Sequence, residues 1–136
     1  MKKNRIRSGM SIMLMLMLML FANYALAAMV TPYADTVFSS ARVSLSTQMD
    51  ASFTAQTKSK QAEIKVTSCI LQIKTGSVWA DSMTLTAPSK VATNTSRYSA
   101  AKDYSSSCSS GNTYRIKAVF DADGHTKTAY SNSISY

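Results

Sequence analysis

The chain has 136 residues, a length that fits one small domain. Its 15 basic and 7 acidic side chains give a net charge of +8, but no basic cluster interleaved with aromatic residues marks a nucleic-acid surface. With two cysteines and one histidine the sequence offers no convincing ligand set for zinc, and we expect neither a metal nor a cofactor.

Residues 1–27 have the pattern of a secretory signal peptide. Basic side chains precede an unbroken apolar run that ends at Ala22, and Ala25-Leu26-Ala27 fits the small-residue rule for cleavage before Ala28. A transmembrane anchor is the alternative, but the run is well short of the roughly 20 residues that a span needs. We therefore expect an extracellular protein whose mature form does not span the membrane.

Removal of the signal peptide would leave a chain large enough for one hydrophobic core. The signal peptide contains four basic residues and no acid, so the mature net charge would be about +4, a mild excess that favours anionic surfaces. We expect residues 28–39 to be a flexible lead-in, because Pro32 and small polar residues offer little to bury. Residues 40–136 would form the domain.

The domain begins with a long alternation. From Ala41 to Gln56, small or apolar residues at odd positions alternate with polar residues at even positions, a period typical of strands. Because strands usually have about 5–6 residues, we expect a bend or bulge near Gln48–Asp50 that divides this stretch into two strands.

The middle of the chain predicts further strands separated by turns. Thr57–Lys60 indicates a turn, and the alternation that follows it slips at Ser68, which we interpret as a bend between two strands. Lys74-Thr75-Gly76-Ser77 predicts a hairpin turn, and Pro88 should end the strand after it because proline cannot donate to a ladder. We expect a loop over Val91–Ser96, a weaker strand over Arg97–Tyr104 and a serine-rich loop around Cys108.

The last quarter, Gly111–Tyr136, predicts two strands joined by the turn Asp121-Ala122-Asp123-Gly124. The first strand has an apolar face that includes Tyr114. The return strand should place Tyr130, Asn132, Ile134 and Tyr136 on one side and Ser131, Ser133 and Ser135 on the other.

In total about eight short strands and no convincing helix indicate an all-β, antiparallel sandwich of the immunoglobulin or fibronectin type III kind, with a small β-barrel as the alternative.

Three segments resemble fibronectin type III modules. Cys69–Trp79 is similar to their C–C′ hairpin, Cys108–Tyr114 to their E–F corner, and Tyr114–Ser131 to their F and G strands. The resemblance implies that Tyr114 is a structural corner residue, with a buried ring and a hydroxyl bonded to the backbone within Ser109–Asn112. It departs from the family where Cys108 and Ser110 replace the usual leucine and proline.

The order Ile-x-Leu-Gln, Gly-x-x-Trp and Gly-x-x-Tyr-Arg after a secretion signal also resembles a group of small secreted proteins of clostridia-type bacteria, a domain of unknown function. That group has no established activity to transfer. The resemblance implies a secreted β-sandwich.

Cys69 and Cys108 are the two cysteines of the predicted mature chain. Export into an oxidising compartment favours a disulfide between them, with two buried free thiols as the alternative. The fibronectin-type resemblance places the two residues at opposite ends of the sandwich, whereas bridged Cα atoms lie within about 7 Å of each other. We expect the bridge because the argument from export does not depend on the strand assignment.

Other candidate sites are weak. His125 should be an exposed turn residue, since no nucleophile motif accompanies it. Asp121-x-Asp123-Gly124 lacks the remaining ligands of a calcium loop, and the sequon Asn94-Thr95-Ser96 is an ordinary loop in a bacterial-looking chain. We therefore expect no enzyme.

Aromatic residues offer one further candidate. They could form a carbohydrate- or protein-binding surface, but their strand phases favour core packing. The residues concerned are Trp79, Tyr98, Tyr104, Tyr130 and Tyr136. The expected function is that of a secreted binding or adhesion-type module, with a cell-wall polymer, a carbohydrate or another extracellular protein as partner. The alternative is an extracellular effector such as a toxin, a bacteriocin-like protein or an inhibitor.

The signal peptide makes a direct prediction. Mass spectrometry of the exported protein should show a chain that begins at Ala28, because Ala25 and Ala27 meet the cleavage rule. A full-length chain retained in the membrane would contradict it.

Overall fold

The structure, a computed structural model, describes residues 37–136. The predicted signal peptide, its cleavage site between Ala27 and Ala28, and most of the predicted lead-in lie outside these residues. The first strand begins at Phe38, slightly before the predicted domain start at residue 40. Within the described part, no helix is long and apolar enough to cross a membrane.

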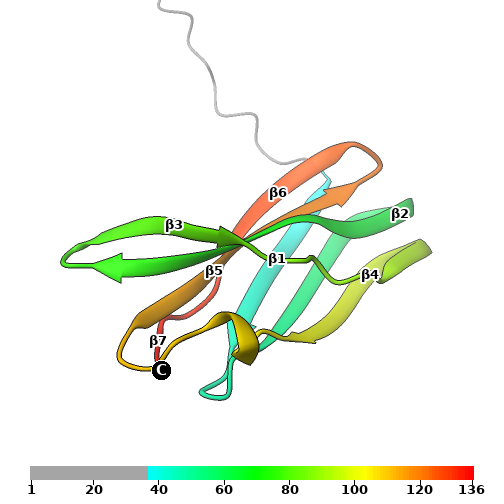
Figure 1. The fold of residues 1–136 in the computed structure, drawn as a ribbon. Coiled ribbons are helices and arrows are strands. Elements are labelled where there is room, and N and C mark those ends of the chain that lie inside the picture. The colour runs from blue at the N-terminus through cyan, green and yellow to red at the C-terminus, as the bar shows by residue number, and fades with distance from the viewer. Residues whose placement is uncertain (1–36) are drawn as a thin grey trace, which may run out of the picture. The chain divides into compact units, whose positions relative to one another are not determined.

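The described residues form an antiparallel all-β fold, as the sequence predicts (Figure 1). One short 3₁₀ turn, η1, interrupts the strands. The elements are β1 (Phe38–Leu45), β2 (Asp50–Thr75), β3 (Val78–Thr84), β4 (Val91–Asp103), η1 (Ser105–Ser107), β5 (Thr113–Ala122), β6 (His125–Tyr130) and β7 (Ile134–Ser135).

Strand β2 has 26 residues and organises the fold. Its first half pairs with β1 along one edge and with β4 along the other. Its second half pairs with β5 and β3, and β6 and β7 are both paired with β5. The result is one curled sheet with two parts, β1-β2-β4 and β3-β2-β5-β6, that enclose the core.

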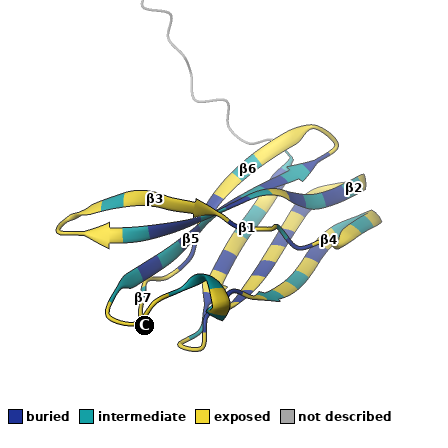
Figure 2. Ribbon diagram, in the orientation of Figure 1, coloured by how far each residue is buried: buried dark blue, intermediate teal, exposed yellow. Residues whose placement is uncertain are grey.

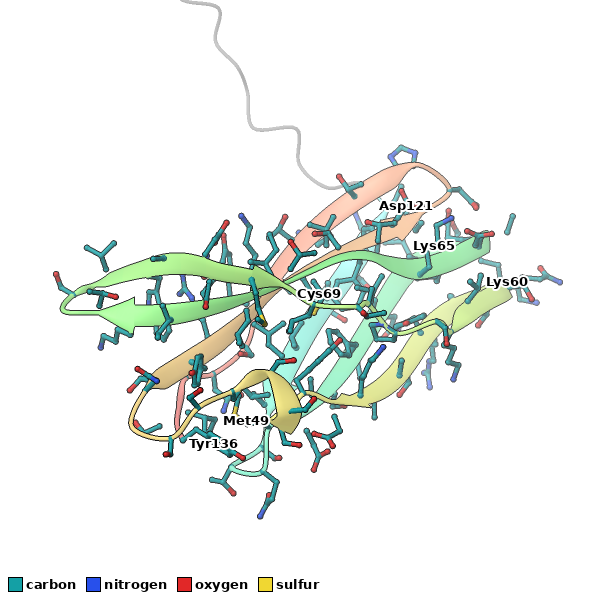
Figure 3. The ribbon with its side chains drawn as sticks, viewed as in Figure 1. Met49, Lys60, Lys65, Cys69, Asp121 and Tyr136 are labelled. Carbon is teal, nitrogen blue, oxygen red and sulfur yellow. The ribbon has the colours of Figure 1, made fainter. Side chains whose placement is uncertain are left out.

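The predicted turn at Thr57–Lys60 is wrong as a strand break, because these residues lie inside β2. The chain does change direction there: β2 bends at the end of the molecule where Figure 3 labels Lys60. The ladder with β4 shifts its register between Gln56 and Gln61 at the same place. Local sequence signals thus mark as a turn a corner where the strand bends and its ladder with β4 is interrupted, although β2 itself continues.

Two further breaks in the alternation have different outcomes. The predicted split near Gln48–Asp50 is confirmed, because β1 ends at Leu45 and Met49 has a positive φ of 68° in the turn before β2. The predicted bend at Ser68 is a register shift between Val66 and Ser68 within the continuous β2. A bulge of this kind lets residues before and after it face the core without ending the strand.

The predicted loop at Val91–Ser96 is instead the first part of β4. Its polar, β-branched residues have no apolar phase, which is why the sequence favours a loop. Backbone pairing from Val91 opposite Lys65 to Thr95 opposite Gln61 makes it a strand. Asn94, the sequon residue, is exposed with a φ of 49°.

The predicted hairpin turns are confirmed. Gly76 has a φ of 62° between the paired residues Thr75 and Val78. Asp123 and Gly124 have φ values of 50° and 86°, the combination of a two-residue type I′ turn that suits the twist of adjoining strands.

The predicted return strand is broken after Tyr130, where Ser131–Ser133 leave the ladder. Ser131 is buried, and its hydroxyl accepts a hydrogen bond of 2.8 Å from the Ile116 N–H. The Asn132 amide accepts from the Leu45 N–H at 2.9 Å and donates to the Leu45 carbonyl at 2.8 Å. One side chain thereby connects the edge of β1 to the segment after β6.

The core lies between the two parts of the sheet (Figure 2). Strict alternation of buried and less buried residues along β5 confirms its predicted apolar face. Two edge-to-face aromatic pairs connect different elements: Phe53 with Tyr104 at 6.5 Å, and Tyr98 with Phe120 at 6.1 Å between ring centroids. Such pairs add to the stability that burial alone provides.

Tyr114 occupies a corner as predicted. Its ring is buried, and its hydroxyl accepts from the Ser109 N–H at 3.1 Å and donates to the Ser109 carbonyl at 3.3 Å. The hydroxyl therefore fastens the loop before β5 onto the strand.

We predict that Tyr114→Phe lowers the free energy of unfolding by about 1–3 kcal/mol, because both hydrogen bonds are lost. Tyr114→Ala should cost about 3–5 kcal/mol through the additional cavity. Denaturant melts measure both.

Tyr98→Phe is the matched control, because the Tyr98 hydroxyl is buried and has no hydrogen-bond partner among the described residues. Removing a polar group that is buried without a partner should be neutral or stabilising. Equal costs for both Tyr→Phe variants would contradict the corner assignment.

Candidate functional site

The outer face of β3-β2-β5-β6, turned away from the core, carries a stacked cation. The Arg115 guanidinium lies 4.4 Å from the centroid of the Trp79 ring and 4.6 Å from that of the Tyr130 ring. The three residues come from β5, β3 and β6, so the stack spans the width of this part of the sheet. Tyr130 is 49% exposed, which leaves much of its ring available to a ligand.

A chain of hydrogen bonds holds the guanidinium in place. Arg115 Nε donates to Gln72 Oε1 at 2.7 Å, and Gln72 Nε2 donates to Asp81 Oδ1 at 2.6 Å. The register supports this order, because Gln72 of β2 is opposite Arg115 on one side and Asp81 on the other. Gln72 is only 6% exposed, so the base of the site is rigid.

Strand alternation adds two lysines to the same face. Lys117 follows Arg115 by two residues and is opposite Tyr130, and Lys74 follows Gln72 by two residues and is opposite Trp79. We call the set Trp79, Arg115, Tyr130, Gln72, Asp81, Lys74 and Lys117 the outer platform. Its basic side chains outnumber its single carboxylate.

The prediction that Trp79 packs in the core is wrong, because Trp79 lies on the outer face of the sheet. The β2–β3 ladder pairs Leu71 with Met83 but Gln72 with Asp81, so β3 contains one extra residue, Ser82. Such a bulge reverses the side-chain phase. Trp79 and Asp81 therefore lie on the outer face. Figure 2 shows β3 as an almost entirely exposed strand, so no core covers it.

The other aromatic candidates divide between the core and the surface. Tyr98 and Tyr104 are buried at 2% and 3% exposure, which confirms core packing for them. Tyr130 and Tyr136 are exposed at 49% and 36%, so their predicted burial is wrong. The reason is that Ala129 is the residue of β6 that faces the core, so Tyr130 faces outward, and Tyr136 lies beyond the last strand, β7.

The predicted Cys69–Cys108 disulfide is not formed in the structure, where both cysteines are free. Cys69 lies in the interior of β2 opposite Ala118 and is fully buried. Cys108 follows η1 and is only partly buried. The Tyr104 hydroxyl, near Cys69, donates to the Thr86 carbonyl at 2.9 Å.

Both thiols have a raised pKa. Burial is the main cause for Cys69, partly offset by the hydrogen bond with Tyr104 and by the charge of Lys102. Burial also raises the pKa of Cys108, and the charge of Asp103 acts in the same direction. Because the thiolate is the reactive form, neither residue has the environment of an activated nucleophile.

The remaining candidate residues, at the β5–β6 turn, do not form a functional site. His125 is exposed at the start of β6, as predicted. The Asp123 carboxylate accepts from the Ala62 N–H at 2.8 Å and the Glu63 N–H at 2.9 Å, so it fastens the β5–β6 turn to β2. Within residues 37–136, no three His, Cys, Asp or Glu side chains gather as a metal site would require.

A hollow of about 540 Å³ lies beside β4, away from the platform. Its charged side chains are both lysines, and it offers no aromatic ring and no acid. The lining residues are Ser52, Pro88, Ser89, Lys90, Ser99, Ala100, Ala101 and Lys102. The hollow therefore has fewer kinds of side chain that could bind a ligand than the outer platform has.

Comparisons with protein-family models, with curated proteins and with solved structures found no match to this chain. The platform is therefore interpreted from its own geometry. It presents two aromatic surfaces, a fixed guanidinium and two flexible ammonium groups on an open sheet face, which suits an extended ligand better than an enclosed small molecule.

The free cysteines make a prediction. In unreduced exported protein, native-state alkylation should label Cys108 first, because it is partly exposed, and Cys69 only after unfolding. Mass spectrometry after each step measures this, with Cys108→Ser as the control that removes the first label. A chain that takes up no label until a reductant is added would mean that the bridge forms.

Proposed function

We propose that the protein is a secreted binding or adhesion-type module whose ligand contacts the outer platform. The observation that carries the proposal is the stack of Trp79, Arg115 and Tyr130 on the outer face, in which Tyr130 is exposed. Tryptophan, tyrosine and arginine are the residue types that dominate binding energy at protein surfaces, because each combines a large contact area with few rotatable bonds or a fixed donor geometry.

The platform has a binding role in this proposal and no catalytic one. A guanidinium stays protonated at physiological pH and cannot exchange protons with a substrate. The Arg115 guanidinium in addition lies against the rings of Trp79 and Tyr130, and its Nε donates to Gln72. Such an arrangement can hold a ligand in a set orientation.

The partner class that fits best is a polymer of the cell surface or the extracellular matrix that contains sugar rings. Aromatic side chains on an open sheet face can stack on sugar rings, and such a face places no limit on ligand length. The strands β3, β2, β5 and β6 are neighbours in the sheet, so their outward residues form a continuous surface.

The fibronectin type III resemblance is part of the proposal. In sandwiches of this kind one sheet contains strands C, F and G, and the other contains A, B and E. The second half of β2 with β5 and β6, and the first half of β2 with β1 and β4, support the same order here. The Tyr114 corner supports it as well, and the departure is that the second and third strands form one continuous β2.

We predict that the exported protein is retained on columns of extracellular polysaccharide and that Trp79→Ala and Tyr130→Ala each weaken retention. An aromatic anchor typically contributes about 1–3 kcal/mol, or roughly tenfold or more in affinity. Affinity electrophoresis or calorimetry measures the change.

His125→Ala is the control, because His125 lies at the opposite end of β6 from Tyr130 and is also an exposed aromatic residue. It should bind like the unaltered protein. Equal loss in all three variants, or no binding of any polysaccharide by the unaltered protein, would overturn the proposal.

A further inference from the structure

The charge of Arg115 is not neutralised within the described part of the chain. Its Nε–H donates to Gln72, but no acceptor among residues 37–136 contacts its two terminal nitrogens. The Asp81 carboxylate accepts from Gln72 and forms no ion pair with Arg115. The salt bridge between Lys65 and Glu63 lies elsewhere on β2.

The geometry of the stack restricts how a ligand can approach the guanidinium. The rings of Trp79 and Tyr130 lie against the guanidinium, and Gln72 holds it at Nε. The terminal edge with its N–H groups is what remains open. Paired N–H donors on one edge match the two oxygens of a carboxylate or of a sulfate, and the neighbouring rings strengthen such a bond by excluding water.

The side chains around the Arg115 stack carry the positive charge that an anion-binding site needs. Lys74 and Lys117 extend from the same face on either side of the stack, and neither has a hydrogen bond or ion pair to another described residue. Asp81 is the platform's one acid. A repeating anionic polymer would therefore meet three cations along the sheet.

We propose that the outer platform binds an acidic polysaccharide, with an oxyanion on a sugar ring held by the terminal nitrogens of Arg115 and the ring itself against Tyr130. This inference rests on the proposed function and specifies its ligand class. The oxyanion is a carboxylate or a sulfate ester, since both present two coplanar oxygens to the fork of an arginine. The fixed guanidinium loses little conformational freedom on binding, which favours affinity.

The test compares three polymers with the exported protein: polygalacturonate, which has only carboxylates, dextran sulfate, which has only sulfates, and neutral dextran. We expect binding of at least one acidic polymer and much weaker binding of neutral dextran. The relative affinities for the first two identify the preferred oxyanion.

Arg115→Gln should lower the affinity for the acidic polymer about tenfold or more, since a paired, charge-assisted contact is lost. Arg115→Lys keeps the charge but not the fork, so it should also bind several-fold more weakly. Arg97→Gln is the matched control, because Arg97 is exposed on β4, in the other part of the sheet, and the change removes the same charge. Circular dichroism and melting of each variant confirm that the fold is kept.

The outcomes separate the two proposals. Equal losses for Arg115→Gln and Arg97→Gln would mean that net charge alone attracts the polymer, and the inference would be overturned. Equal binding of neutral and acidic polymers that depends on Trp79 and Tyr130 would overturn the inference and leave the proposed function standing. No binding of any polymer would overturn both.

Discussion

The continuity of β2 is the constraint on which the rest of the structure depends. Four of the other six strands are paired directly with it, and the remaining two, β6 and β7, are paired with β5. Because β2 bends near Lys60 and continues, the same strand belongs to both parts of the sheet. The buried residues of β2 are odd-numbered in its first half, even-numbered at Ile64 and Val66, and odd-numbered again at Cys69 and Leu71. The register shifts between Gln56 and Gln61 and between Val66 and Ser68 produce these two changes of phase, so both halves face the enclosed core.

The platform follows from this arrangement. The second half of β2 has neighbours on both edges, so Gln72 is held between Arg115 and Asp81 by the register of two ladders. Its inner face packs on the core, and no other described element covers its outer face, which leaves the Arg115 stack at the surface of residues 37–136. A cation held by two rings on a rigid sheet is pre-organised for a partner, whereas a lysine on a loop would first have to be ordered.

Several polar side chains hold segments of the fold together where the strand ladders end. Tyr114 fastens Ser109, Asn132 connects to Leu45 and Asp123 caps Ala62 and Glu63. Each replaces a stretch of backbone pairing where the ladders end. The corner at Tyr114 could be predicted from its resemblance to a known pattern. The roles of Asn132 and Asp123 could not, because their partners are 87 and 60–61 positions away in the chain.

The sequence by itself determined the all-β class, the inward faces of β1, the first half of β2 and β5, the glycine turns at Gly76 and Gly124, and the corner at Tyr114. These features depend on period-two alternation and on local backbone preferences, which act between residues close in the chain. Only the tertiary structure decided that Thr57–Lys60 stays in a strand, that Val91–Ser96 pairs with β2, that the cysteines are free, and that Trp79 and Tyr130 meet at Arg115. The physical reason is that pairing register and bulges, such as that at Ser82, are set by contacts with distant strands, and one extra residue is enough to move a side chain to the opposite face.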